Sequence, residues 1–490
     1  MKLLNKYKLI GAVAFLVLFS SCERDFDELN TDPNSPISVP PENLLTNALF
    51  NLTYSYWDRD LNFEFGELMV QHMAQNEYTE EQNYNFAQAN FDFRWGNLYA
   101  GWDVTSAPQG GMYDLVAARQ LIEEDETIPA DIKANKLAVI DIFRSFSFQM
   151  VTDLWGNVPY SQAFQPSEYP APAYDNQADI YAGMISTVTV AVNSIDVSAD
   201  GFASGDILFD GNMADWRNFG NALLLRMGMR ISEANSTLAQ STVSTALGAS
   251  LPSSDVMFIF DGANQDLANP FYQDRVISTR DDFRISEILV NQMLSNNDPR
   301  LAMYASPAPG GTDIIGMPYG LNDGGAFALK NGTSDIHENI ENNPTAPAYL
   351  ISIAEIEFFR AEAIARGWVS GSAQAAYESA ITASMNQWGV DVAAAAAYLT
   401  EPDVAYDATS LATELESIAE QKWVALYTNG VEAYAEWRRL DFPTLAPGSG
   451  AFESSIPLRM LYPVTEDGTN GGNLDAAGPN TLSTAVWWDK

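Results

Sequence analysis

The sequence predicts a mainly α-helical fold, a helical-repeat scaffold of four helix pairs with long irregular loops and a few short strands. Apolar residues recur with helical period from about residue 110 onward, and the periodic segments come in pairs separated by short breaks. Paired amphipathic helices of this size are typical of stacked repeats, in which each unit buries its apolar face on its neighbour. The predicted pairs are 112–124 with 131–153, 177–194 with 213–233, 351–366 with 373–388, and 411–428 with 430–438.

The periodic segments also carry the residues that we expect to form the core. One face of the segment 131–153 and the residue after it holds Ile140, Phe143, Met150 and Leu154. Apolar residues at this spacing lie on one side of a helix, where they pack against a neighbouring element. On the same ground we expect three tryptophans in helical segments to be core residues, namely Trp216, Trp388 and Trp423.

Two regions stand apart from this helical pattern. Residues 250–348 carry many Gly, Pro, Asn and Asp residues and contain strand-like fragments such as 256–260. Residues 51–102 are unusually aromatic, and within them we expect 67–75 to be a helix that packs His72 in the core. Because long irregular stretches are usually functional, both regions are candidates for ligand binding.

Length and composition indicate a globular protein. The chain has 490 residues, of which 47% are hydrophobic and 18% are charged, so it is too apolar to be disordered. Its formal net charge of −39 repels phosphate backbones, which argues against nucleic acid as a partner. One cysteine and two histidines exclude a disulfide framework and closed Cys/His zinc sites.

The N-terminus has the features of a lipoprotein signal peptide over residues 1–21. Three lysines precede an apolar run at 9–19, which is too short to be a permanent membrane span, and Cys22 follows two serines. Cys22 stands where such signals place the residue that receives lipid, so we expect membrane attachment through a lipid anchor. The acidic, proline-containing segment 22–40 is predicted to be a tether, and 41–490 to be a single helical domain.

Motifs for catalysis and nucleotide binding are absent from the sequence. It has no glycine-rich phosphate loop, no Gly-x-Ser-x-Gly elbow, and no second histidine that would make His337 part of a metalloprotease helix. Asp58, Asp60 and Asn62 begin like an EF-hand loop, but Phe63 stands where that loop requires glycine. We therefore expect no catalytic residue and no cofactor, and we assign no metal ligand. A calcium site of scattered loop oxygens and a carboxylate pair for glycoside hydrolysis both stay open.

Six segments along the chain carry a family likeness. They are Asp27-Glu28-Leu29-Asn30-Thr31-Asp32-Pro33-Asn34, Asp153-Leu154-Trp155-Gly156-Asn157-Val158-Pro159-Tyr160-Ser161, Asp215-Trp216 with the helix at 221–230, and the segments 354–363, 430–439 and 456–463. Together they resemble, in order, the motifs of the SusD/RagB-like nutrient-binding outer-membrane lipoproteins of Bacteroidetes. The likeness spans nearly the whole chain.

The resemblance implies a single α-helical domain of four tetratricopeptide-like units without catalytic activity. It further implies a lipoprotein on the extracellular side of the outer membrane, partnered with a SusC-like TonB-dependent transporter. Such a protein delivers captured glycan to the transporter or, in relatives of the RagB type, peptide. The acidic run after Cys22 resembles the signal that sends such lipoproteins to the outer face.

Ligand contacts are expected in the two regions that stand apart from the helix pairs. Sugars present apolar C–H faces between hydroxyls, so a receptor needs aromatic platforms with amides and carboxylates nearby. In the family that the chain resembles, ligand contacts come from loops in these two parts of the chain. The candidate residues are Trp57, Tyr78, Tyr84, Phe271, Tyr272, Tyr319 and Asn322.

The charge of the chain favours a neutral glycan over uronate or sulfated chains, although salt weakens this bias. An outer-membrane glycoside hydrolase, a RagB-type peptide-binding lipoprotein and a scaffold that binds only protein stay as alternatives. Arg226, Arg230, Glu355 and Glu362, which belong to the family-like segments, are expected to form buried ion pairs that fix helix packing.

Overall fold

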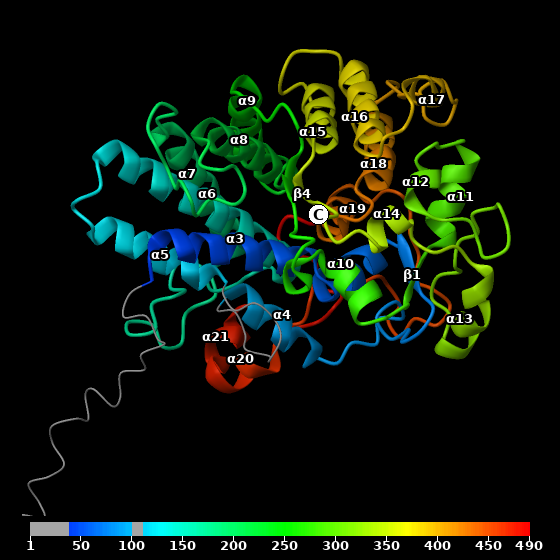
Figure 1. Cartoon of the computed structure of the whole chain (residues 1–490), viewed down its shortest axis with the longest axis horizontal. Coiled ribbons are helices and arrows are strands. Elements are labelled where there is room, and N and C mark those ends of the chain that lie inside the picture. Colours follow the sequence, from blue (N-terminus) through cyan, green and yellow to red (C-terminus); the bar gives the residue numbers. More distant parts are fainter. Residues whose placement is uncertain (1–38, 100–110) are drawn as a thin grey trace, which may run out of the picture. The chain divides into compact units, whose positions relative to one another are not determined.

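The computed structural model describes residues 39–99 and 111–490 and is built mainly from helices (Figure 1). The four predicted helix pairs are present, which confirms the expected fold class. They are α5 (Met112–Glu124) with α6 (Ala130–Trp155), α7 (Gln177–Ser194) with α8 (Met213–Arg230), α15 (Ile353–Ala365) with α16 (Ala373–Gln387), and α18 (Leu411–Ala425) with α19 (Gly430–Leu440). The two helices of each pair pack on each other, and the α6–α7 and α15–α18 contacts join neighbouring pairs.

Local sequence explains where several of these helices begin and end. The side chain of Asn212 accepts hydrogen bonds from the first backbone N–H groups of α8, and Ser352 does the same for α15. Helix α6 ends before Gly156, whose φ of +83° is a conformation that favours glycine. The indole N–H of Trp155 donates to the carbonyl of Leu461 at 2.9 Å. The C-terminal segment is thereby fixed against the Trp-Gly-Asn turn.

The remaining chain forms shorter elements around the pairs. The N-terminal part comprises α3 (Pro41–Trp57), the π-helix η1 (Arg59–Glu67) and α4 (Asn90–Tyr99). The insert comprises η2 (Gln265–Leu267), α10 (Pro270–Tyr272), η3 (Gln273–Ile277), α11 (Glu287–Ser295), α12 (Leu301–Tyr304), α13 (Asp323–Leu329), η4 (Lys330–Gly332) and α14 (Glu338–Glu341). The other short helices are α9 (Ser236–Gly248), α17 (Val392–Tyr398), α20 (Val464–Thr469) and α21 (Gly471–Ala476).

Two small antiparallel sheets connect the insert to distant parts of the chain. Strand β1 (Met73–Gln75) pairs with β3 (Phe283–Ile285), with Met73 opposite Ile285. Strand β2 (Val256–Phe258) pairs with β4 (Ala348–Ile351), which leads directly into α15. The strand expected near 256–260 is therefore confirmed. The helix expected over 67–75 is present only as far as residue 69. The rest of this prediction is wrong, because the chain then turns and the backbone of 73–75 makes strand hydrogen bonds with the insert.

Buried ion pairs link the helix pairs, as the sequence predicted. Arg226 on α8 contacts Glu355 on α15 at 2.6 Å, and Arg230 contacts Glu432 on α19 at 2.6 Å. Arg439 at the end of α19 contacts Glu362 at 2.7 Å. These side chains are all nearly inaccessible to solvent. Charges in such positions must be paired, so the network fixes how the pairs stack.

The N-terminal elements pack closely on the last helix pair. Gly66 in η1 lies against Gly430 at the start of α19, where a Cβ on Gly66 would come within 2.3 Å of the Gly430 carbonyl carbon. Next to this contact His72 is fully buried, with Nδ1 3.1 Å from a Glu67 carboxylate oxygen. The expectation that His72 is a packed core histidine is confirmed.

The predictions for the N-terminus fall outside the part of the chain that the structure describes. They concern the signal peptide at 1–21, lipid attachment at Cys22 and the tether at 22–40, of which only the last two residues are described. In the described ranges 39–99 and 111–490, every helix is too short or too polar to cross a membrane.

Candidate functional site

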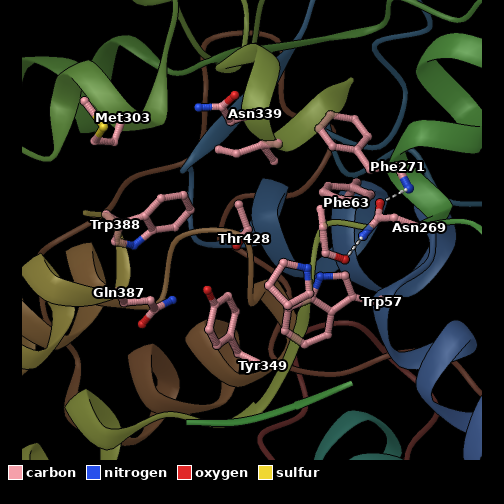
Figure 2. Close-up of a pocket in the computed structure, with 13 residues that line it drawn as sticks. Trp57, Phe63, Asn269, Phe271, Met303, Asn339, Tyr349, Gln387, Trp388 and Thr428 are labelled. Carbon is pink, nitrogen blue, oxygen red and sulfur yellow. Dashed lines mark hydrogen bonds between the residues drawn. The ribbon is translucent and has the colours of Figure 1, made fainter. Parts of the chain in front are cut away.

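A pocket lies where the end of α3, α10, β4 and the end of α16 come together (Figure 2). Its volume is about 220 Å³. The lining comes from segments that are far apart in the sequence, so the pocket exists only in the folded chain. The lining residues are Trp57, Phe63, Asn269, Phe271, Met303, Asn339, Ile340, Ala346, Pro347, Tyr349, Gln387, Trp388 and Thr428.

Three aromatic side chains surround the space. Trp57 is the last residue of α3, Tyr349 lies on β4, and Trp388 follows the last residue of α16. Figure 2 shows these rings on different sides of the pocket, with Thr428 between them. Trp388 and Tyr349 are half-buried, and Trp57 is almost fully buried. Rings that are held in place and partly open to a cavity are suited to contact flat, apolar parts of a ligand.

Neighbouring aromatic residues hold these rings in position. Trp388 packs edge to face on Tyr304, with ring centroids 4.8 Å apart, and Tyr304 stacks on Tyr427 at 4.4 Å. On the other side Phe63 stacks on Phe271 at 4.2 Å. Because these contacts restrict side-chain rotation, little further order has to be imposed when a ligand binds.

Polar groups of the pocket are uncharged amides and hydroxyls. Asn269 has a structural role, since its Oδ1 accepts from the Phe271 N–H at 2.8 Å and its Nδ2 donates to the Ala346 carbonyl at 3.0 Å (Figure 2). These bonds fix α10 against the segment before β4. The amides of Gln387 and Asn339 also line the pocket, and Asn339 is exposed. Amides of this kind donate to and accept from hydroxyl groups.

The pocket is free of formal charge in a very acidic protein. Of the described residues that line it, none is Asp, Glu, Lys, Arg or His. Burial, followed by the charge of Asp255, raises the pKa of the Tyr349 hydroxyl to about 12, so this group stays protonated at neutral pH. A charged ligand group would lose its hydration here without meeting a counterion. The chemistry of the pocket therefore favours neutral ligands.

Two of the predicted site residues, Trp57 and Phe271, line this pocket, and Tyr272 follows half-buried on α10. Tyr84 and Tyr319 are buried core residues, and the Tyr319 hydroxyl donates to the Leu68 carbonyl at 2.8 Å. Neither of these rings lines the pocket, so we no longer include the two tyrosines in the site.

The other two predicted residues are exposed but do not line the pocket. Tyr78 is 57% exposed, and the guanidinium of Arg280 lies over its ring at 4.9 Å. The side chain of Asn322 begins helix α13 by accepting from the Gly325 N–H at 2.9 Å. Tyr78 presents a ring to solvent, whereas Asn322 has a structural task that explains its position.

The described lining has five aromatic residues, and sequence reasoning missed three of them, Phe63, Tyr349 and Trp388. Trp388 was expected in the core because it follows the helical spacing of α16, but the helix ends just before it and its ring is half-buried at the pocket. Gly389, with a φ of +68°, marks this helix end in the sequence. Of the four residues of β4, Tyr349 is half-buried and the other three are buried. A glycine directly after a helical tryptophan was the signal that could have indicated Trp388.

The described residues contain no group of three or more His, Cys, Asp or Glu side chains that could hold a metal ion. The lining of the pocket also lacks, among the residues described, the pair of carboxylates that glycoside hydrolysis requires. Fold and site together define a class, a helical-repeat protein with an aromatic pocket whose described lining is uncharged.

The chain belongs to the SusD-like family, whose description is "starch-binding associating with outer membrane" and which it matches over residues 33–463. This confirms the resemblance that the sequence motifs carry. No curated protein matches the chain.

Solved structures of this family have the same fold. A chitin-binding protein is 25% identical, with a TM-score of 0.78 over 92% of this chain and 99% of its own. A chitin-binding SusD homologue from Flavobacterium johnsoniae is 23% identical, with a TM-score of 0.75 over 92% of this chain and 97% of its own. A SusD-like protein from Bacteroides thetaiotaomicron is 21% identical, with a TM-score of 0.76 over 92% of this chain and 99% of its own.

Proposed function

We propose that this protein captures a neutral glycan in the pocket of Trp57, Tyr349 and Trp388 and does not cleave it. The observation that carries the proposal is the combination of three aromatic walls with a lining that holds no Asp, Glu, Lys, Arg or His among the described residues. Rings bury the C–H faces of a sugar, and amides bind its hydroxyls. The glycan chemistry of the family supports the proposal, as does the description of one 25% identical neighbour as chitin-binding.

The cellular role that we propose follows the family. The mature chain would be anchored through lipid on Cys22 at the extracellular side of the outer membrane, consistent with the family's association with that membrane. It would hand the glycan to a SusC-like TonB-dependent transporter. Purification of the transporter from detergent-solubilised outer membranes tests this partnership, because the two proteins should be recovered together. Recovery of an unlipidated form from the periplasm would contradict the anchor.

A calorimetric titration tests the ligand class. We expect at least one of the soluble neutral polysaccharides or N-acetylglucosamine oligomers to bind. Polyuronates and sulfated glycans should bind more weakly than this neutral ligand. If only anionic polymers bind, the proposal is wrong. Incubation of a bound oligosaccharide for several hours should release no reducing ends, and release would instead support the hydrolase alternative.

Substitution of Trp388 tests the position of the site. If a sugar covers about 60 Å² of the indole, loss of the ring costs about 1.5 kcal/mol of binding free energy, or about a tenfold weaker affinity. Trp388→Ala should show this loss. Trp368→Ala is the matched control, since Trp368 is also half-buried but lies outside the pocket and contacts Arg366. Equal affinities of the two variants would reject the site.

A further inference from the structure

A second cavity, of about 420 Å³, is lined in part by elements that also line the first pocket. The C-terminal turn of α3 contributes to both, because Trp57 lines the first pocket while Tyr54 and Ser55 line the second. Helix α10 does the same, with Phe271 in the first lining and Pro270 in the second. We call the second cavity the acidic pocket. The shared walls place it within reach of a ligand chain that is longer than one sugar.

The acidic pocket carries an excess of negative charge. Its lining includes the carboxylates of Asp58, Asp60, Asp266 and Asp274, but only one guanidinium, that of Arg59. That guanidinium is already engaged, at 2.8 Å from Asp274 and 2.7 Å from Asp282. The Asp266 carboxylate is exposed and makes no ion pair within the described residues. Asp60 lies 3.9 Å from Arg94, and Asp58 accepts from the Leu61 N–H at 2.8 Å but makes no ion pair within the described residues. The carboxylates of Asp58 and Asp266 therefore line the cavity without a counterion.

The pocket also holds groups that are typical of ligand contacts. Ser55 is only 7% exposed, and no hydrogen bond among the described residues uses its hydroxyl group. Its hydroxyl is open to the cavity, so a ligand hydroxyl or amine that enters there would bond to it. The half-buried rings of Tyr54 and Phe93 lie in the same lining. Aromatic rings, a free hydroxyl and carboxylates together match the surface of a sugar.

We propose that the acidic pocket binds a sugar residue that carries a free ammonium group, as in a de-N-acetylated amino sugar. The inference rests on the proposed function and deepens it, because the first pocket would hold a neutral residue of the same chain. An ammonium group donates three hydrogen bonds and is attracted by carboxylates that lack partners. The net charge of −39 would also concentrate such a ligand near the protein.

Two other cations fit less well. A metal ion needs ligand atoms gathered around one point, whereas the described residues contain no group of three His, Cys, Asp or Glu placed to hold one. A lysine side chain of a peptide would meet the carboxylates but would leave the rings of Tyr54 and Phe93 without a flat partner. The pKa of Asp58 also reflects the crowding of carboxylates in this pocket. Burial is the largest cause that raises this pKa well above its usual range, and the negative charge of the neighbouring Asp60 is the next.

The test compares two β-1,4-linked N-acetylglucosamine hexamers, one fully acetylated (the acetylated hexamer) and one with a single de-N-acetylated residue (the glucosamine hexamer), so that both offer neutral residues to the first pocket. Calorimetric titrations at about pH 5.5 keep the amines charged and the exposed carboxylates ionised. The proposal expects the glucosamine hexamer to bind at least about fivefold more tightly than the acetylated hexamer. A rise from about 0.05 to 0.5 M NaCl should remove most of this difference, because salt screens exposed charges.

Variants assign the effect to the acidic pocket. Asp266→Asn should weaken the glucosamine hexamer about fivefold and leave the acetylated hexamer unchanged. Asp467→Asn, which removes an exposed carboxylate of α20 outside this lining, should change neither. Ser55→Ala should weaken the glucosamine hexamer and leave the thermal unfolding midpoint unchanged.

The outcomes separate the two proposals. If the acetylated hexamer binds as tightly as the glucosamine hexamer, or if Asp266→Asn weakens both equally, the acidic pocket is not an ammonium site and the proposed function stands. If calcium chloride or a lysine-containing peptide competes better than the glucosamine hexamer, the assigned ligand is wrong. If neither hexamer and no neutral polysaccharide binds, the proposed function itself fails.

Discussion

Substitution of the buried ion pair between Arg226 and Glu355 tests whether buried charges fix how the helix pairs stack. Arg226 Nε and Nη2 lie 2.6 and 2.7 Å from the two oxygens of Glu355, and Nη2 also donates to the Leu350 carbonyl at 2.6 Å. Both side chains are 1% exposed. The nearest further carboxylate of Arg226 is that of Glu432, at 3.6 Å. Neither charge can reach water if its partner is removed.

Arg226→Met should therefore destabilise the protein by about 3–5 kcal/mol, because Glu355 keeps its burial and loses its main counterion. Glu355→Met should cost less, since Arg226 still has Glu432 and the Leu350 carbonyl nearby. The double variant should be more stable than Arg226→Met alone, because an apolar pair leaves no unpaired charge. Urea unfolding followed by tryptophan fluorescence gives the free energies of unfolding of all four proteins.

The pH dependence provides a second measurement. Burial raises the pKa of Glu355 in the folded protein, although Arg226 opposes this shift. A carboxyl with a raised folded pKa contributes stability below its unfolded pKa, near 4.5, and loses it as the pH rises through the folded value. Without Arg226 the pKa of Glu355 rises further. The loss of stability of Arg226→Met relative to the natural protein should therefore be larger at pH 8 than at pH 5. The reasoning is refuted if the single variants cost less than about 1 kcal/mol, or if the double variant costs the sum of both.

Two further predictions concern the packing of other regions. Burial raises the pKa of Glu341 to about 7, so its contribution to stability is present below about pH 4.5 and is lost as the pH rises through 7. As the pH rises from 5 to 8, the free energy of unfolding of Glu341→Gln should therefore increase relative to that of the natural protein. If the difference between the two proteins is the same at both pH values, the raised pKa of Glu341 is refuted. Gly66→Ala should destabilise by about 3 kcal/mol or more, since its Cβ would lie 2.3 Å from the backbone of Gly430. Gly332→Ala is the control, with nothing within 4 Å of the added atom, and equal thermal midpoints of the two variants would contradict the close contact.

The helix pairs could be predicted because their signal is local. Apolar side chains at a spacing of three and four, such as Ile140 and Phe143, lie on one helix face whatever the rest of the chain does. The caps are local as well, as Asn212 and Ser352 show. The sequence motifs also sufficed for the family, since the match over residues 33–463 confirms it.

The candidate pocket could be predicted only by region. Trp57 and Phe271 line the first pocket, but Tyr84 and Tyr319 come from the same two regions and are buried. An aromatic residue in an irregular segment has the same local sequence signal whether it faces a cavity or the core. Which of the two it does depends on segments that are distant along the chain.

By itself, the sequence determined the four helix pairs and the family, because hydrophobic period, capping and motifs act over a few neighbouring residues. Only the tertiary structure decided that Trp57, Tyr349 and Trp388, more than 300 positions apart at the extremes, enclose one uncharged pocket. It also decided that a second cavity, to which α3 and α10 contribute as well, is acidic. The physical reason is that a pocket is formed by side chains from segments that meet only when the core is packed, and packing is a property of the whole chain.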